Sequence, residues 1–179
     1  MSNGTFERTI TVTGKHAVKS FLSSSSRYRV LEVEVSTAFV KGNDWPSIRQ
    51  TLEQLIIKYR TVQSQAIQAR AGAAASQGIM AKVALKMGHV SMLDEWLGGD
   101  RRCLILDHLQ DPHNVGACIR SALAFGVDVI VIAKTGACAI TPAVAKVAAG
   151  AIGQVDICEA NISQAIGRIQ ELGIWVMAT

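Results

Sequence analysis

The stretch LILDHLQDPHNVGACIRSALAFGVDVIVIAK, residues Leu104–Lys134, largely determines how the second half of this chain is expected to fold. It opens and closes with apolar runs that are typical of buried strands. A polar turn, Asp111–Asn114, follows the first run, and a helix of small residues then extends to Phe125, where Gly126 is expected to end it. A strand, a helix and a second strand in this order form the basic unit of a parallel sheet.

The same alternation continues beyond this stretch. Apolar runs predict strands at Cys103–Asp107, Val127–Ala133, Gln154–Ile157 and Ile174–Met177. Helices are expected at Pro142–Ala149 and at Ile162–Leu172, the second ending at Gly173. Continuous Val- and Ile-rich strands that alternate with helices predict a parallel sheet covered on both faces, so the fold class is α/β.

Asn114 and Arg120 are the first candidates for a functional site, because they follow the carboxyl end of the first predicted strand. Ligands of open parallel sheets bind beyond these ends, and a guanidinium there suits a phosphate or a ribose phosphate. Gly116, one turn before Arg120, would leave the helix surface low enough for a ligand to approach. The alternative is structural, with Asn114 as a helix N-cap and Arg120 as an exposed arginine or an ion-pair partner of Asp107 or Asp111.

The first half predicts a set of shorter elements. A helix is expected at residues 14–22, and Arg29–Val35 alternates in the manner of a half-buried strand. Asp44 can cap a helix whose apolar stripe contains Ile48, Leu52, Leu55 and Ile56. Further strands are expected at Thr61–Gln65 and Gln77–Val83, with Ala71–Ser76 as a tight, mobile connection and Gly98–Gly99 as a hinge.

The net charge of +4 lies entirely in the first half. Residues 1–100 contain 12 Lys or Arg and 8 Asp or Glu, whereas residues 101–179 contain 6 of each. The segment between Glu53 and Asp94 lacks acidic residues and contains five basic ones, namely Lys58, Arg60, Arg70, Lys82 and Lys86. A surface made from this segment would attract a polyanion, and an ordinary solvated face is the alternative.

Composition argues against several other classes of protein. No apolar run approaches the ~20 residues of a membrane span, and the N-terminus has neither a signal-peptide core nor an Arg-rich presequence. The four cysteines form no CxxC pair, so we expect no metal site, and free thiols in apolar contexts point to a cytoplasmic protein. A dinucleotide-binding oxidoreductase would need G-x-G-x-x-G after a strand, and AKTGACA does not match it.

The quoted stretch resembles the first motif of the SpoU (TrmH) family of RNA ribose 2′-O-methyltransferases. The shared frame is LD, three residues, DP-x-N-x-G-A, two residues, R-S-A and then small residues to Gly126. GKHAVKSFL resembles the start of the family's N-terminal substrate-binding domain, and SQGIMAKV resembles the last strand of that domain. KVAAGAIGQV and LGIWVMAT resemble later parts of the methyltransferase domain, so the resemblance covers essentially the whole chain.

The resemblance implies a domain arrangement. Residues 1–90 would form a small α/β substrate-binding domain that binds RNA, and residues 91–100 a linker. Residues 101–179 would form the first part of a SPOUT domain, whose parallel sheet contains a trefoil knot. The family's second and third motifs would follow Thr179, so we expect the C-terminal part to be absent and the chain to be truncated. The chain departs from the family at Ser76, where His is common, and at Gly153, where Glu is common.

The resemblance also implies an activity, which is methyl transfer from S-adenosylmethionine (AdoMet) to a ribose of rRNA. The most similar type methylates a guanosine of 23S rRNA, and the alternatives are a tRNA methyltransferase and a non-catalytic RNA-binding protein of the same fold. The partners would be RNA and a second copy of the chain in a homodimer, without a membrane. AdoMet is expected in the full-length protein but not on these 179 residues alone, where only Thr179 would lie at the edge of the cofactor site.

The implied catalytic residues are Arg120 and Asn114. Transfer to a ribose 2′-hydroxyl requires that this weak nucleophile be positioned and its developing charge be stabilised. Because a guanidinium stays protonated in proteins, Arg120 is expected to hold the adjacent phosphate and the 2′-oxygen, while Asn114 orients Arg120 or the ribose. His113 is a weaker candidate for a base and is more simply a turn residue. The RNA-binding residues would be the five basic residues of the acid-free segment and Gln77.

Overall fold

The computed structural model describes residues 5–23, 25–71 and 77–178 of the 179-residue chain. The chain divides into two units, each with a core of its own. Thr9–Leu85 forms the N-terminal unit, and the residues up to Arg8 together with those from Lys86 onward form the C-terminal unit. Two strands, β1 (Thr5–Thr13) and β4 (Ile79–Gly88), contain residues of both units.

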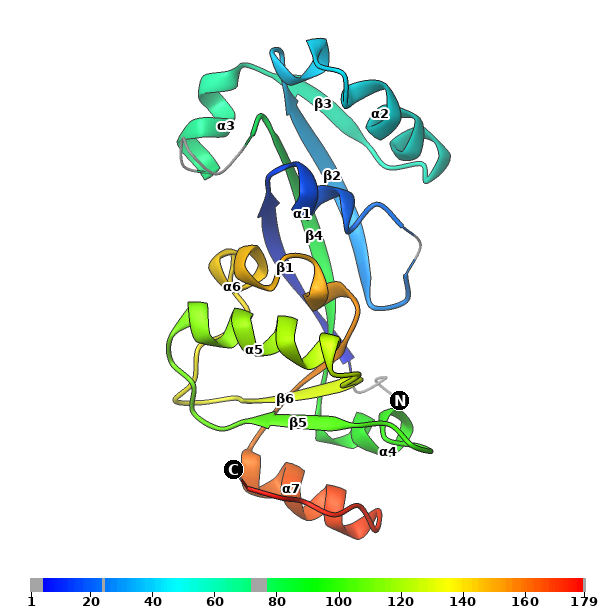
Figure 1. Cartoon of the computed structure of the whole chain (residues 1–179), viewed down its shortest axis with the longest axis vertical. Coiled ribbons are helices and arrows are strands. Elements are labelled where there is room, and N and C mark those ends of the chain that lie inside the picture. The colour runs from blue at the N-terminus through cyan, green and yellow to red at the C-terminus, as the bar shows by residue number, and fades with distance from the viewer. Residues whose placement is uncertain (1–4, 24, 72–76, 179) are drawn as a thin grey trace. The chain divides into compact units, whose positions relative to one another are not determined.

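The N-terminal unit contains a sheet in the strand order β3-β2-β4. Strand β2 (Tyr28–Ser36) runs parallel to β3 (Tyr59–Val62) and antiparallel to β4, and β1 also pairs with β4. The unit also contains the helices α1 (Lys15–Lys19), α2 (Trp45–Gln54) and α3 (Ser64–Ala71) and the 3-10 turn η1 (Phe39–Lys41), as Figure 1 shows. The strand predicted at residues 29–35 is therefore confirmed, and the one predicted from residue 77 begins at Ile79 and runs on to Gly88.

The apolar stripe predicted on α2 is only partly correct. Ile48 and Leu52 are buried, but Ile56 is 90% exposed. The helix ends at Gln54, and Ile56 adopts a positive φ of 56°, which turns the chain away from the core. Asp44 occupies the position before α2 but does not cap it with its side chain, because its carboxylate binds Lys15 Nζ at 2.8 Å and Lys19 Nζ at 3.3 Å.

The strand predicted at Thr61–Gln65 was placed too late. The pairing of β3 with β2 starts at Tyr59 opposite Val33 and ends at Val62 opposite Ser36, and α3 begins at Ser64. The helix predicted at residues 14–22 is also shorter than expected, since α1 ends at Lys19. Of the connection predicted at Ala71–Ser76, Ala71 is the last residue of α3, and residues 72–76 lie outside the described part of the chain.

The C-terminal unit contains the predicted parallel sheet. Strands β5 (Cys103–Leu106), β6 (Val129–Ala133) and β7 (Asp156–Ala160) pair in parallel, and Met87 and Gly88 at the end of β4 pair in parallel with β7. Helices α5 (Pro112–Ala124) and α6 (Pro142–Ala148) lie on one face of this sheet, and α4 (Leu93–Trp96) and α7 (Ile162–Glu171) lie on the other (Figure 1). Every residue of β6 is buried, as expected for a strand covered on both faces.

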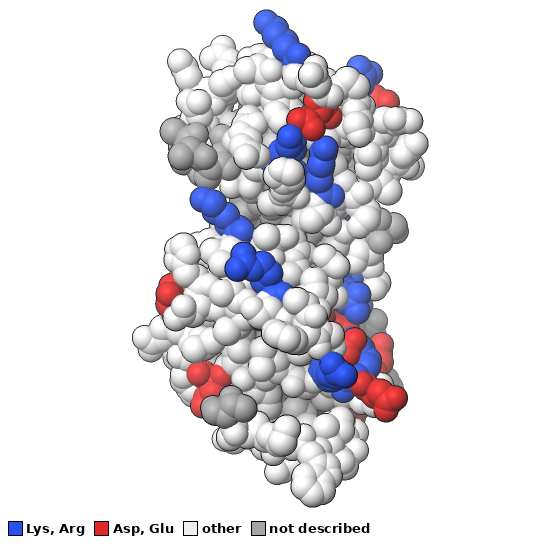
Figure 2. All heavy atoms as spheres, viewed as in Figure 1, with Lys and Arg blue, Asp and Glu red and all other residues white. Residues whose placement is uncertain are grey.

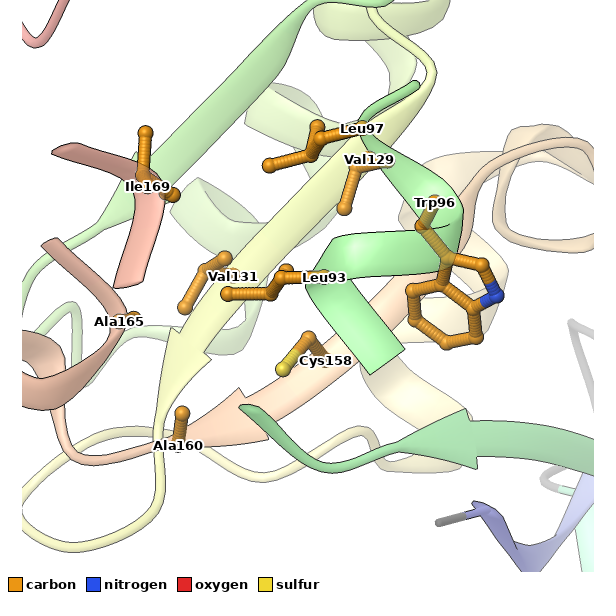
Figure 3. Packing of buried hydrophobic residues seen from close by; sticks show 9 residues of the cluster. All are labelled: Leu93, Trp96, Leu97, Val129, Val131, Cys158, Ala160, Ala165 and Ile169. Carbon is orange, nitrogen blue, oxygen red and sulfur yellow. The ribbon is translucent and has the colours of Figure 1, made fainter. Parts of the chain in front are cut away.

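One core cluster of the C-terminal unit joins α4 and α7 to the sheet, as Figure 3 shows. Its buried members are Leu93, Trp96, Leu97, Val129, Val131, Cys158, Ala160, Ala165 and Ile169. The segment 91–100, expected as a linker, therefore contributes three apolar side chains to this core. Gly88 permits the contact with Trp96, because a Cβ at residue 88 would lie 2.3 Å from the Trp96 ring.

The end of the C-terminal unit differs from the prediction. Gly173 ends α7 as expected, with a φ of 75° and with Ile174 N donating to Ile169 O at 3.2 Å. The strand predicted at Ile174–Met177 is wrong, since this segment has no strand pairing with the described residues. Trp175 and Met177 are 94% and 86% exposed. The strand predicted at Gln154–Ile157 lies two residues later, because η3 (Ala151–Gly153) precedes it.

Three further observations concern the described residues as a whole. None of their helices is long and apolar enough to cross a membrane. They contain no group of three or more His, Cys, Asp or Glu side chains that could hold a metal ion. The four cysteines are free, and burial raises the pKa of the Cys103 thiol to about 11 and that of Cys158 to about 12, so both are poor nucleophiles.

Candidate active site and RNA-binding surface

Three polar side chains mark the carboxyl edge of the parallel sheet. Asp107, Lys134 and Asn161 are the first residues after β5, β6 and β7. The strand register brings these ends together, and Lys134 N donates to Ala160 O at 3.0 Å. Asn161 is used structurally, because its side chain accepts from Gln164 N and caps α7. Asp107 and Lys134 remain exposed at the edge where parallel sheets bind ligands.

The loops after β5 and β6 pack against each other at this edge. Cys138 N donates to Leu109 O at 2.8 Å. His108 has a positive φ of 49°, and its Nδ1 forms a short contact with Asp107 Oδ1. A Cβ at Gly136, which has a φ of 71°, would lie 2.8 Å from His108 Cδ2. His108 and Gly136, which both have a positive φ, are therefore in close contact at the edge where a ligand would approach.

Helix α5 begins at Pro112, two residues before Asn114, which had been a candidate for its N-cap. Asp111 is the N-cap, and its side chain accepts from His113 N at 3.0 Å. Pro112 occupies the first helical position, where its missing N–H costs nothing. The structural alternative that made Asn114 the N-cap is therefore wrong. Asn114 lies in the first turn, is exposed and forms no side-chain hydrogen bond with any described residue.

Arg120 lies farther from the carboxyl edge than its place in the motif suggested. It follows Asn114 by six residues within one helix, which separates them by about 9 Å along the axis and about 120° around it. No hydrogen bond joins the two side chains, so Asn114 does not orient Arg120 directly in this structure. Arg120 is exposed and forms no ion pair with Asp107, Asp111 or any other described acid. Long helical side chains lean toward the helix N-terminus, which for α5 is the carboxyl edge of the sheet.

The glycine beside Arg120 serves packing and not ligand approach. Gly116 is buried, and a Cβ there would lie 2.6 Å from Val147 Cβ and 2.9 Å from Val144 O. The expectation that Gly116 leaves a free surface for a ligand is therefore wrong, because α6 occupies that space. The exposed surface of α5 instead contains Asn114, Arg120 and Ser121.

The opposite edge of the sheet carries charges that neutralise one another. Arg101 Nη2 lies 2.5 Å from Asp156 Oδ2, and its Nε lies 3.8 Å from Asp128 Oδ1. Arg102 donates through Nη1 to Phe125 O at 2.9 Å. These arginines tie the amino ends of the strands together, so their role is structural. The two edges thus differ in kind, because Arg120 and Lys134 have no such acidic partner among the described residues.

The basic residues expected to bind RNA fall into two groups. Lys58 and Lys82 are exposed in the N-terminal unit, and Lys86 is exposed in the C-terminal unit. Arg60 and Arg70 instead share the carboxylate of Glu34, which is only 4% exposed. Arg70 Nη1 lies 2.8 Å from Glu34 Oε1, and Arg60 Nη2 makes a shorter contact with the same oxygen.

Charge pairing explains how Glu34 tolerates burial. Burial by itself raises the pKa of its carboxyl, but the hydrogen bonds and positive charges of Arg60 and Arg70 outweigh this effect and hold the pKa below 4.5. The side chains of Arg60 and Arg70 remain 59% and 46% exposed. Figure 2 shows both basic and acidic side chains on one face of the molecule. Glu34, which lies outside the acid-free segment in sequence, neutralises part of the positive charge of that segment.

Gln77 is held from the side of α1. Its Oε1 accepts a hydrogen bond from Lys15 N at 2.9 Å, which leaves its Nε2 as a donor. Gln77 has a positive φ of 43°, and the next residue, Gly78, has one of 76°. A Cβ at Gly78 would lie 2.5 Å from Ser36 Oγ, so glycine is required there.

Comparison with known proteins connects this geometry to a family. The model of the SpoU rRNA Methylase family matches residues 101–179, which include the whole of β5 and α5. Over 170 residues the chain is 33% identical to the 23S rRNA (guanosine-2′-O-)-methyltransferase RlmB of Shewanella oneidensis, and the match covers 93% of this chain and 68% of that protein. The RlmB of Pseudomonas syringae pv. tomato is also 33% identical, over 174 residues, with 93% and 67% covered. The chain belongs to the SpoU rRNA methylase family.

Solved structures share the fold of this SpoU family member. The SpoU methyltransferase AviRb from Streptomyces viridochromogenes in complex with AdoMet has a TM-score of 0.71 at 15% identity, over 95% of this chain and 61% of that one. The AdoMet-bound rRNA methyltransferase from Sinorhizobium meliloti has a TM-score of 0.69 at 16% identity, over 91% and 58%. The chain thus spans about 60% of the length of these solved chains.

The site also contains residues that sequence reasoning missed in this SpoU chain. Asp107, His108, Lys134 and Gly136 all lie at the carboxyl edge. The predicted strand ends carried a signal for Asp107 and Lys134, since each follows a strand directly, but the contact of His108 with Gly136 depends on loop conformation. Of the two departures from the family pattern, Gly153 is buried in η3, whereas Ser76 lies outside the described residues. So does Thr179, the residue expected at the edge of the cofactor site.

Proposed function

We propose that this SpoU family member acts in the cytoplasm as an AdoMet-dependent RNA 2′-O-methyltransferase. Its substrate would be a guanosine ribose of 23S rRNA, and its active form a homodimer. The observation that carries the assignment to particular residues is the position of Arg120. It is exposed on α5, within the matched family region, and has no acidic partner among the described residues, unlike Arg101 of the same unit.

Arg120 would act by charge and not as a base. A phosphate next to the reacting ribose can accept a bidentate hydrogen bond from the guanidinium. That contact would hold the 2′-hydroxyl in place and stabilise the negative charge that develops on its oxygen. Asn114, about 1.7 turns nearer the carboxyl edge, would contact the ribose itself. This role for Asn114 is consistent with its exposure and its free amide, whereas direct orientation of Arg120 is not.

The described residues fit an AdoMet site only in part. AdoMet supplies the methyl group as an activated sulfonium. The carboxyl edge presents the carboxylate of Asp107 and the ammonium group of Lys134, and both are exposed. Their opposite charges suit the amino and carboxylate groups of the methionine part of AdoMet.

The N-terminal unit would supply RNA affinity, so the domain division at residues 1–90 remains part of this proposal. Lys58 and Lys82 are exposed without an acidic partner among the described residues. Arg60 and Arg70 keep part of their donor capacity for phosphates, since two guanidinium groups share one carboxylate. Contacts of this kind position a nucleic acid without reading its sequence.

The test is methyl transfer from labelled AdoMet to 23S rRNA by the complete gene product, with tRNA as the competing substrate. Arg120→Ala should lower the rate by about 100- to 1000-fold, the cost of one preorganised charge contact. Arg120→Lys should restore it only partly, because an ammonium cannot copy the planar fork. Ser121→Ala, which changes the neighbouring exposed residue of α5, is the matched control and should leave the rate unchanged.

Two results would overturn the proposal. Near-normal transfer by Arg120→Ala would remove Arg120 from the chemistry. Tight RNA binding with no methyl transfer by the unmodified complete protein would instead favour a non-catalytic RNA-binding protein of the same fold. Transfer to tRNA in preference to rRNA would replace the substrate and leave the roles of the residues in place.

A further inference from the structure

The N-terminal unit has a hollow that both polar and apolar groups line. Its volume is about 270 Å³, and its lining includes Ser36, Phe39, Ser64, Gln68, Gln77 and Gly78. Pockets for whole small molecules typically span roughly 300–1,000 Å³. A hollow just below that range suits a single planar group and not a complete cofactor.

The lining offers the chemistry that an unpaired RNA base requires. Gln77 keeps its amide Nε2 as a donor, because its Oε1 is occupied by Lys15 N. Ser36 Oγ accepts from Phe39 N at 3.0 Å, so its hydroxyl hydrogen can be donated to a ligand. Gln68 and Ser64 have no side-chain partner among the described residues and supply further donors and acceptors.

Backbone conformation opens the hollow. The positive φ angles of Gln77 and Gly78 bring this turn against the end of β2, where Ser36 N donates to Gly78 O at 2.7 Å. A Cβ at Gly78 would lie 2.5 Å from Ser36 Oγ and 3.1 Å from Phe39 Cβ. The absence of that Cβ leaves Phe39 and Ser36 at the lining of the hollow. Phe39 thereby provides an aromatic ring on which a base can stack.

A phosphate-binding pair lies next to the hollow. Ser36 follows Glu34 by two residues on β2, so both side chains point to the same face, about 7 Å apart. Glu34 holds Arg60 and Arg70, and Arg70 belongs to the same helix as Ser64 and Gln68. The exposed parts of both guanidinium groups can therefore reach the backbone of a strand whose base enters the hollow.

We propose that this hollow binds one unstacked base of single-stranded RNA, while Arg60 and Arg70 hold an adjacent phosphate. The inference rests on the proposed function, because it gives the N-terminal unit a specific contact with the RNA substrate. Sequence-specific RNA binding uses bases that leave the stack, rest on aromatic side chains and hydrogen-bond through their edges. A buried serine hydroxyl and two exposed glutamine amides beside a phenyl ring match that requirement better than they match an apolar peptide side chain.

The test compares a fluorescently labelled single-stranded RNA of mixed sequence with a duplex of the same length, using anisotropy and the 179-residue chain. Gln68→Ala should weaken binding of the single strand by about 3- to 10-fold, the usual effect of one hydrogen bond. Phe39→Leu should weaken it by about 5-fold or more through lost stacking. Neither change should alter duplex binding. Gln65→Ala, an exposed glutamine of α3 outside the hollow, is the matched control and should bind both RNAs normally.

The outcomes separate this proposal from the one it rests on. If the chain binds both RNAs and the two hollow variants bind as tightly as Gln65→Ala, the hollow is not a base site, and a protein side chain becomes its better occupant. If the unmodified chain binds neither RNA at low salt, the proposed RNA-binding role of the N-terminal unit fails as well. Gln68 is exposed and its side chain has no hydrogen-bond partner among the described residues, so its variant remains informative if Phe39→Leu is poorly folded.

Discussion

Two glycine-to-alanine changes in the C-terminal unit should alter stability in opposite directions. Gly116 lies in α5 and Gly167 in α7, and both are inside regular helices. Alanine is favoured over glycine in a helix by about 0.8–1.0 kcal/mol. The two sites differ in their surroundings, since a Cβ at Gly167 meets nothing within 4 Å, whereas one at Gly116 meets α6.

The magnitude at Gly116 follows from the contact distances. A new Cβ would lie 2.6 Å from Val147 Cβ and 2.9 Å from Val144 O, and neither atom is the flexible end of a side chain. Relief requires α5 and α6 to separate by most of an ångström. Overpacking of this kind costs about 1–3 kcal/mol, and the gain in helix propensity offsets part of that. We expect Gly116→Ala to destabilise the protein by about 1–2 kcal/mol and Gly167→Ala to stabilise it by about 0.5–1 kcal/mol.

Urea unfolding followed by circular dichroism measures both free energies, and thermal unfolding gives an independent check. For a chain of this length 1 kcal/mol corresponds to a shift in Tm of about 2–4 °C. Stabilisation by Gly116→Ala as large as that by Gly167→Ala would refute the close packing of α5 on α6. Because α5 also holds Arg120, Gly116→Ala should lower methyl transfer by the complete protein as well, and unchanged transfer would separate packing from function.

Two further predictions concern charge. At neutral pH, Glu34→Gln should lower the free energy of unfolding by about 1–2 kcal/mol, a value reduced because both arginine partners are half exposed. The folded pKa of Glu34 is depressed, so this stabilisation is present above 4.5 and is lost as the pH falls through the folded pKa, and a difference that persists in acid would contradict the assignment. RNA binding should weaken steeply with salt, and Lys82→Ala should reduce the slope of log K against log salt by about 0.7, the value for one phosphate contact on a single strand. An unchanged slope would show that Lys82 does not contact the RNA.

The parallel sheet could be predicted because its signal is local. The run Val129–Ala133 is apolar at every position, which only a strand buried on both faces requires. The start of α5 was also available in the sequence, since Asp111 followed by Pro112 is a standard N-cap and first-turn pair. The Asp111–Pro112 pair therefore indicates an N-cap at Asp111 more strongly than Asn114 by itself indicates one at residue 114.

Features that depend on pairing between distant segments could not be predicted in the same way. The position of β3 is set by its register with β2, which places Tyr59 opposite Val33. The role of Gly116 depends on the close approach of α6. This helix begins at Pro142, which is 26 residues after Gly116. A glycine in a helix of small residues is compatible both with the approach of a ligand and with close packing of another helix. Only the position of α6 in the structure shows that Gly116 serves helix packing.

The acid-free segment shows how strand pairing changes a charge argument. Parallel pairing of β2 with β3 places Glu34 opposite Arg60, although the two are 26 residues apart in sequence. The same carboxylate also binds Arg70 of α3, so these three residues carry a net charge of one and not two. Had Glu34 been exposed beside them, its carboxylate would offset the attraction of one of the two arginines for a phosphate. Its burial instead places the carboxylate behind the guanidinium groups, which keep outward donors. The capacity of the N-terminal unit to bind a polyanion therefore depends on two arginines that the buried Glu34 holds in place and on the exposed lysines Lys58 and Lys82. It does not follow from the lack of acidic residues between Glu53 and Asp94 in the sequence.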